Sequence, residues 1–140
     1  MKKAYKRGFV AGNFDVVHPV YIQMFKTCKE LCEEFVVFLQ TDPTVERPEK
    51  LKPIFSTKER KDLLESIKHI DRVITYTYER ELYDLIENGS FDLRFLGDDY
   101  KNKSYTADDL GIEVYFLDRS HGWSATKYKE LIAKSLKKQQ

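Results

Sequence analysis

Several features of secreted, membrane and nucleic-acid-binding proteins are missing from this chain of 140 residues. No apolar run approaches the roughly 20 residues that a membrane-spanning helix needs. No long apolar stretch follows the basic first residues, so we expect no signal peptide. Lys and Arg total 24 against 23 Asp and Glu, a net charge of +1. This balance argues against a protein that holds nucleic acid mainly by charge.

Cysteine is scarce, with only Cys28 and Cys32 in the chain. The two lie four residues apart, at helical spacing, on the same side as Phe25, and we interpret them as small core residues. A redox or metal pair is the alternative, but no cluster of Cys or His lies nearby in sequence to complete such a site. We therefore expect a reducing, cytoplasmic location.

The composition and length indicate one folded domain. Hydrophobic residues make up 41% and aromatic residues 14% of the chain, which argues against disorder. Two domains would each have about half the usual length. We expect a single domain over residues 1–140, with residues 134–140 as a loose basic tail.

Strand-like and helix-like segments alternate along the chain. The run Phe35–Leu39 is continuously apolar, which is typical of a strand buried on both faces. Ser56 and Glu59 have the spacing of a capping box that opens a helix. The pattern predicts strands at 7–12, 35–39, 72–76, 92–96 and 112–117, with helices at 19–33, 56–67, 81–87 and 124–136. This alternation favours an α/β fold, a Rossmann-like five-stranded parallel sheet with helices on both faces.

Ligands of such sheets bind beyond the carboxyl ends of the strands. The first predicted strand ends at Gly12, where a glycine lets the backbone approach a ligand closely. His18 follows at the start of a helix, where free N–H groups favour an anion. It can donate hydrogen bonds to a phosphate, although an incidental histidine in a strand–turn–helix is equally compatible with the pattern.

Further polar residues follow the other predicted strands. Lys50 and Lys52 lie on a proline-containing loop and can close over a phosphate, or form an ordinary charged loop. Arg60 offers forked donors for phosphate oxygens, or a surface ion pair. The acidic pair Asp98 and Asp99 can hold a hydroxyl or a metal, or serve as turn residues. Arg119, Ser124 and Thr126 can form a second anion site at a helix start, or the hydroxyls can be simple caps.

The chain has no G-x-G-x-x-G, Walker A or nucleophile-elbow pattern. A phosphate site with His, Lys and Arg, and without an obvious covalent nucleophile, suits direct in-line transfer by positioning and charge neutralisation.

Five of these segments, in order, resemble motifs of the cytidylyltransferase family of the H-x-G-H nucleotidyltransferase superfamily. Gly12-Asn13-Phe14-Asp15 with His18 is similar to its G-x-F-D-x-x-H-x-G-H element, and Asp42, Lys50 and Lys52 match its acidic and paired-lysine loop. Glu59-Arg60-Lys61 matches its helix start, and Gly97-Asp98-Asp99-Tyr100 resembles its G-D-D-W. The segment 119–126, R-S-H-G-W-S-A-T, resembles its R-T-x-G-I-S-T-T. The resemblance covers roughly residues 7–133.

The resemblance implies a nucleotidyltransferase that moves a cytidylyl group from CTP to a small phosphorylated alcohol, most simply glycerol 3-phosphate. The products are a CDP-alcohol and pyrophosphate. It implies Mg²⁺ bound through the nucleotide phosphates, no metal site of the protein's own, no nucleic-acid partner and a homodimer. The implied catalytic residues are His18, Lys50, Lys52 and Arg119. The implied nucleotide-binding residues are Gly12, Asn13, Phe14, Asp15, Tyr21, Gly97, Asp99, Ser124 and Thr126, and the acceptor-binding residues are Asp42, Arg60 and Lys68. Asp15, Asp42 and Asp99 can alternatively be structural.

The chain departs from the family pattern close to the expected nucleotide. Tyr21 replaces the second histidine of H-x-G-H, Val20 replaces its glycine, and Ala125 replaces a hydroxyl residue. A tyrosine can donate one hydrogen bond but cannot carry positive charge. Two alternatives therefore stay open. One is a nucleotidyltransferase with another nucleotide or another acceptor, such as phosphocholine, phosphoethanolamine or a sugar phosphate. The other is a catalytically weak protein that binds a nucleotide without turning it over.

Overall fold

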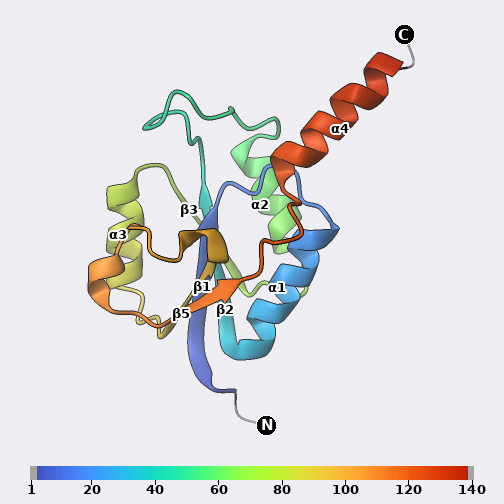
Figure 1. Ribbon diagram of the computed structural model, residues 1–140. Helices are drawn as coiled ribbons and strands as arrows, with labels where there is room; N and C mark the ends of the chain where they lie inside the picture. Colours follow the sequence, from blue (N-terminus) through green and yellow to red (C-terminus); the bar gives the residue numbers. More distant parts are fainter. Residues whose placement is uncertain (1–2, 139–140) are drawn as a thin grey trace.

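The structure, a computed structural model, describes residues 3–138 and contains a five-stranded parallel sheet (Figure 1). The strand order is β3-β2-β1-β4-β5, and all neighbouring strands are parallel. The strands are β1 (Tyr5–Gly12), β2 (Cys32–Gln40), β3 (Arg72–Tyr76), β4 (Leu93–Gly97) and β5 (Val114–Leu117).

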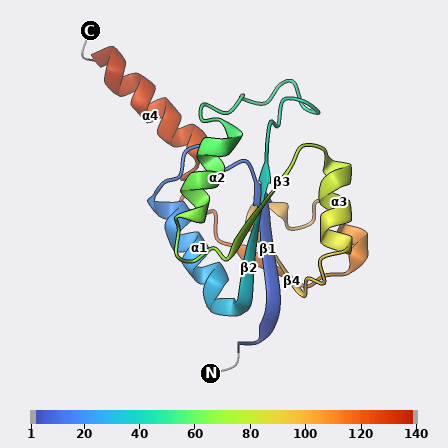
Figure 2. The same ribbon diagram turned by 180° about the vertical axis from the view of Figure 1, so that it is seen from behind.

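Helices cover both faces of the sheet, as the sequence predicts. Helices α1 (Pro19–Leu31) and α2 (Thr57–Glu65) lie on one face and α3 (Glu79–Glu87) lies on the other (Figure 2). Between β4 and β5 the chain forms two 3₁₀ turns, Asp98–Tyr100 and Asp108–Leu110. The Rossmann-like α/β prediction is confirmed, with element boundaries shifted by a few residues.

Each face of the sheet has its own apolar core because side chains alternate along a strand. In β2, Phe35 and Val37 pack with Phe25 of α1 and Leu64 of α2. The intervening residues of β2, with Leu82 and Ile86 of α3, form the second core. Burial of β2 on both sides explains its uninterrupted apolar sequence.

The predicted helix over 19–33 ends two residues early, at Leu31. Cys32 adopts an extended backbone and pairs with Tyr5 as the first residue of β2. Both Cys32 and Cys28 are fully buried, and the Cys32 thiol donates to the Cys28 carbonyl at 3.3 Å. Burial is the main cause that raises the pKa of both thiols. The interpretation as core residues is confirmed.

Helix α4 (Ala125–Lys138) points away from the sheet (Figure 1). Residues 134–138, which we expected in a loose tail, are part of this helix, and residues 139–140 lie outside the described part. Leu131, Ile132 and Leu136 of α4 are exposed. Among residues 3–138, no helix is both long and apolar enough to cross a membrane.

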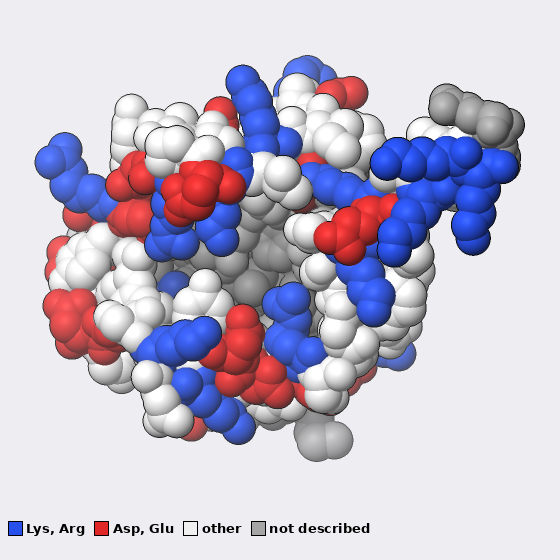
Figure 3. Space-filling view, turned by 45° about the horizontal axis from the view of Figure 1, so that its top comes forward, with Lys and Arg blue, Asp and Glu red and all other residues white. Residues whose placement is uncertain are grey.

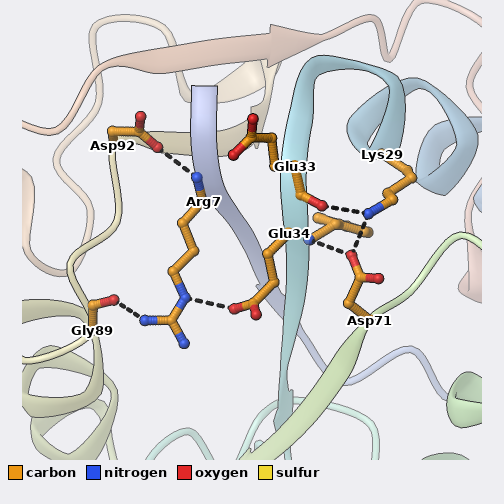
Figure 4. Close-up of polar contacts among 8 residues, drawn as sticks. Arg7, Lys29, Glu33, Glu34, Asp71, Gly89 and Asp92 are labelled. Carbon is orange, nitrogen blue, oxygen red and sulfur yellow. Dashed lines mark hydrogen bonds and ion pairs between the residues drawn. The ribbon is translucent and has the colours of Figure 1, made fainter. Parts of the chain in front are cut away.

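A polar network closes the amino edge of the sheet (Figure 4). Arg7 of β1 donates through Nε to Glu34 of β2 at 2.6 Å and through Nη1 to the Gly89 carbonyl. Asp71, just before β3, accepts from Lys29 and from the Phe35 amide, both at 2.7 Å. These contacts tie together the starts of β1 and β2, the residue before β3 and the turn before β4.

Candidate active site

A cavity of about 450 Å³ opens at the carboxyl edge, where β1 lies between β2 and β4. This is the switch point at which sheets of this order bind ligands. Figure 3 shows a hollow in this face with Lys and Arg side chains on several sides of its rim. A second hollow, of about 510 Å³, lies between α3 and the sheet and contains none of the predicted site residues.

The segment after β1 forms one wall of the cavity. The lining includes Gly12, Asn13, Phe14 and Tyr21, and their role in binding the nucleotide stays a prediction. Phe14 is buried with a positive φ of 42°, and its ring packs edge-on against Tyr21 and Phe25. A side chain at position 12 would begin 3.0 Å from the Phe14 ring. Glycine at position 12 therefore allows Phe14 to hold this left-handed turn.

His18 is the N-cap residue of α1 and is only 5% exposed. Its Nδ1 accepts a long hydrogen bond of 3.4 Å from the Tyr21 amide, and its buried Nε2 has no partner. Burial, followed by the charges of Arg119 and His121, lowers the pKa of His18. A neutral ring that accepts at Nδ1 carries its proton on Nε2. His18 thus offers an unpaired N–H donor at a helix start.

An aromatic stack encloses His18. Its ring lies 3.9 Å from that of Tyr21 and 4.7 Å from that of Tyr128, and Trp123 stacks on Tyr128 at 5.0 Å. Tyr21 also lines the cavity, whereas His18 is not among the lining residues. Burial raises the pKa of Tyr21, so its hydroxyl stays a neutral donor.

Arg119 follows β5 and lines the same cavity, close enough for its charge to act on His18 and Tyr21. Its amide donates to Asp98 at 3.2 Å, which joins the ends of β4 and β5. A Cβ at Gly97 would overlap the Asp99 carboxylate and lie 3.1 Å from Cγ of Arg119. Gly97 thus leaves space for both side chains beside the cavity.

Arg60 does not act as the predicted acceptor ligand, because all of its N–H groups are used inside the protein. The side chain is 1% exposed. It donates to the carbonyls of Phe55, Asn13, Gln40 and Thr41 at 3.1, 2.9, 2.7 and 2.5 Å, and to the Thr57 hydroxyl at 3.3 Å. Arg60 is therefore a positioning residue that ties the segment after β1 to the segment after β2.

Asp15, predicted as a nucleotide ligand, is likewise occupied internally. It is 1% exposed and accepts from the amides of Ile54 and Phe55 at 2.7 and 2.9 Å. Its Oδ2 also lies 2.5 Å from Nζ of Lys129 in α4. Burial opposes ionisation of Asp15, but these three donors outweigh it and lower its pKa. The structural alternative for Asp15 is the one that the geometry supports.

Several of these residues line a cavity at the expected edge of a Rossmann-like sheet, and the comparisons with known proteins agree. The family model described as "Cytidylyltransferase-like" matches residues 9–130. The chain belongs to the cytidylyltransferase-like family. Glycerol-3-phosphate cytidylyltransferases are similar to this chain over nearly their whole length. The chain is therefore a nucleotidyltransferase.

Three similar proteins show the range of the family. Glycerol-3-phosphate cytidylyltransferase of Bacillus subtilis (strain 168) is 34% identical over 91% of this chain and 98% of its own. FAD synthase of Thermococcus sibiricus is 33% identical over 79% of this chain and 82% of its own. A lipopolysaccharide core biosynthesis protein of Thermoplasma volcanium GSS1 superposes with a TM-score of 0.63 and 29% identity, covering 82% of this chain and 96% of its own.

The loop after β2 brings only part of its predicted set to the cavity of this cytidylyltransferase-like chain. Lys50 lines the cavity, whereas Lys52 is exposed on the same loop outside the lining. Asp42 accepts from the amide and hydroxyl of Thr44 at 2.9 and 2.6 Å, an Asx turn that shapes the loop. Lys68 lies between α2 and β3, at the amino edge, because α2 runs back across the sheet. Lys68 is not among the residues that line the cavity, and its assignment as an acceptor ligand stays a prediction.

The start of α4 also lies outside the lining. Ser124 accepts from the Lys127 amide at 3.1 Å and thereby caps α4, and Thr126 is exposed in the first turn. Asp99 is exposed next to the cavity. The cap interpretation of Ser124 is confirmed, and a role for these three residues in binding the nucleotide stays a prediction.

Sequence reasoning missed three residues that line the cavity beside Tyr76. They are Glu79 of α3, Arg94 of β4 and Tyr105 of the segment after β4. A signal was available, since Arg94 interrupts the apolar run Leu93–Leu96 of a buried strand. Within residues 3–138, no three or more His, Cys, Asp or Glu side chains gather to hold a metal ion.

Proposed function

We propose that the enzyme transfers a cytidylyl group from CTP to a small phosphorylated alcohol, most simply glycerol 3-phosphate. The similarity to the glycerol-3-phosphate cytidylyltransferase of Bacillus subtilis over 91% of the chain supports this choice. The observation that carries the proposal is the unpaired, buried Nε2 of His18 at the start of α1, beside Tyr21 and Arg119.

The reaction is a direct in-line displacement. A phosphate oxygen of the acceptor attacks the α-phosphorus of CTP, the bond to the β-phosphate oxygen breaks, and pyrophosphate leaves with that electron pair. The chain contributes positioning and charge rather than a covalent nucleophile. His18 donates its Nε2–H to the α-phosphate as negative charge develops there. Because Tyr21 and Tyr128 cover His18, the nucleotide must displace part of this stack.

The cations around the cavity bind the remaining phosphates. Arg119 and Lys50 line the cavity, and Lys52, two residues along the same loop, reaches the phosphates when the loop closes. Gly12, Asn13 and Gly97 let the nucleotide approach the backbone. Ser124 and Thr126 bind the outer phosphates at the start of α4, where free amides favour an anion.

As the family resemblance implies, Mg²⁺ would be held by the oxygens of the triphosphate. Bound there, it neutralises phosphate charge. We also propose that the enzyme is a homodimer, as the family resemblance implies.

Tyr21 stands where the family motif has its second histidine. We propose that its hydroxyl donates to the triphosphate in place of the second histidine, since it lines the cavity and stays neutral. The stacking of Tyr21 on His18 favours a second candidate, a protein that binds a nucleotide without turnover. A Tyr21→Phe variant tests the role of the hydroxyl, because unchanged turnover and unchanged nucleotide affinity would contradict it.

The test of the proposed function is pyrophosphate release. The protein is mixed with Mg²⁺, each of CTP, ATP, GTP and UTP, and in turn glycerol 3-phosphate, phosphocholine, phosphoethanolamine and sugar phosphates. We expect release with CTP and glycerol 3-phosphate. Release with another pair would identify a different nucleotidyltransferase. No release from folded protein that binds CTP would favour the binding protein, and no nucleotide binding would contradict the proposal.

A further inference from the structure

Arg94 is a buried cation on the wall of the cavity that lies away from His18. It belongs to β4, is 5% exposed and lines the cavity. Its neighbours there are Tyr76 and Glu79 from the β3–α3 side and Tyr105 from the segment after β4. None of the motif residues of the β1–α1 segment belongs to this group.

The guanidinium of Arg94 is held in place but only partly paired. Its Nη1 donates to the Thr106 carbonyl, and its Cζ lies 5.2 Å from the Phe9 ring centroid and 4.9 Å from that of Tyr105. Its Nε is buried without a partner. No carboxylate of the described residues lies within 4.0 Å of it, and the Glu79 carboxylate accepts at 2.6 Å from the Thr106 hydroxyl.

Arg60 provides a comparison within the same protein. The two arginines are similarly buried, yet Arg60 uses five donors on five acceptors. Arg94 makes one such bond, to Thr106. Burying a cation is costly unless it is paired and hydrogen-bonded. Arg60 is fully hydrogen-bonded within the protein, whereas Arg94 is not. Of the two residues, Arg94 is the one that lines the cavity.

We infer that Arg94 is an acceptor-binding residue whose guanidinium pairs with an anionic group of the phosphorylated acceptor. This inference rests on the proposed function, in which the β1–α1 segment and Arg119 bind the nucleotide. The β3–α3 wall is then left to the acceptor. The forked donors of arginine suit a phosphate or a carboxylate. The hydroxyl-bearing side chains Tyr76, Tyr100, Ser104 and Tyr105 line the same wall and suit a polyol or a hydroxy acid.

The test uses two acceptors with one carbon skeleton. Glycerol 3-phosphate and 3-phosphoglycerate share a phosphate and differ in a hydroxymethyl group against a carboxylate. Arg94→Met removes the charge, and Arg94→Lys keeps the charge and one donor for the Thr106 carbonyl. The control variant, Arg72→Met, also replaces an arginine by methionine, but at an exposed position outside this cavity. The measurements are acceptor KM at saturating CTP, the Kd of each acceptor and of CTP by titration calorimetry, and Tm.

We expect Arg94→Met to raise the KM and Kd of the acceptor at least tenfold while the Kd of CTP changes less than twofold. We expect Arg94→Lys to cause an intermediate loss of acceptor affinity and Arg72→Met to cause none. An equal loss for both acceptors assigns Arg94 to the shared phosphate, and a loss confined to 3-phosphoglycerate assigns it to the carboxylate. Both outcomes support the inference.

Two outcomes overturn the inference: unchanged affinity for both acceptors in folded Arg94 variants, or a loss of affinity that falls on CTP instead. Failure of the proposed function is separate and appears as wild-type protein that releases no pyrophosphate. Acceptor binding by titration still tests Arg94 in that case, and wild-type protein that binds neither acceptor contradicts both proposals.

Discussion

Replacing Arg60 by lysine separates the structural role of this residue from a role in phosphate binding. Lysine keeps the positive charge but offers three N–H donors, whereas Arg60 uses five. At least two of the acceptors must therefore lose their partner in a site that is 1% exposed. An orphaned buried acceptor costs about 1–3 kcal/mol.

We expect Arg60→Lys to lower the free energy of unfolding by about 2–4 kcal/mol, because water can pair with some of the carbonyls that lose their donor. For a chain of this size the loss corresponds to a fall in Tm of about 6–15 °C. The assay is urea unfolding, with a thermal scan, of wild-type protein, Arg60→Lys and the exposed control Arg72→Lys. We expect the control to stay within about 0.5 kcal/mol of wild type.

Acceptor kinetics complete this test. If Arg60 bound the acceptor phosphate, the lysine variant would keep its stability and show a raised acceptor KM. The structural role would be refuted if Arg60→Lys lowered the free energy of unfolding by less than about 1 kcal/mol and also raised the acceptor KM. The geometry predicts that the Arg60→Lys variant is less stable. It also predicts that the variant binds acceptor and nucleotide both more weakly, because the loops that Arg60 ties together are displaced.

Three further substitutions test other parts of the site. Asp15→Asn is expected to lower the free energy of unfolding by about 2–4 kcal/mol at pH 7, since it leaves Lys129 without its partner. The lowered pKa of Asp15 means that this difference disappears as the pH falls below about 4 and through the folded-state pKa, which urea unfolding against pH will show. The lowered pKa of His18 makes wild-type protein lose stability as the pH falls below about 6.5, and the same assay should give a flatter profile for His18→Gln. Gly97→Ala is expected to weaken CTP binding about tenfold in a calorimetric titration, with little change in Tm, because the new methyl group displaces the side chain of Arg119. Unchanged CTP affinity would show that this side of the cavity does not bind the nucleotide.

Much of the fold follows from local patterns that the sequence displays. The uninterrupted apolar run of β2 and the capping box at Ser56 depend on near neighbours, so strands and helices were placed within a few residues. The turn after β1 was recognised because Gly12 and His18 mark a strand end and a helix start.

The roles of several charged residues depend on distant partners, and the sequence does not reveal these. Arg60 finds carbonyl groups that lie up to 47 residues away, and Asp15 finds amides about 40 residues away. A phosphate-binding arginine and a buried structural one look alike in a motif. Arg94 was missed although the apolar run of β4 displays it, because nothing in the local sequence shows that its side chain reaches a cavity.

The carboxylate of Asp15 joins three stretches of chain that are far apart in sequence: the turn after β1, the backbone at Ile54 and Phe55, and Lys129 of α4. These stretches cannot detach independently without stranding a buried charge. They therefore form one cooperative opening unit. Hydrogen exchange at the Ile54 and Phe55 amides should therefore occur only when α4 is released. A ligand that binds either the Ile54–Phe55 segment or α4 should slow the opening of both.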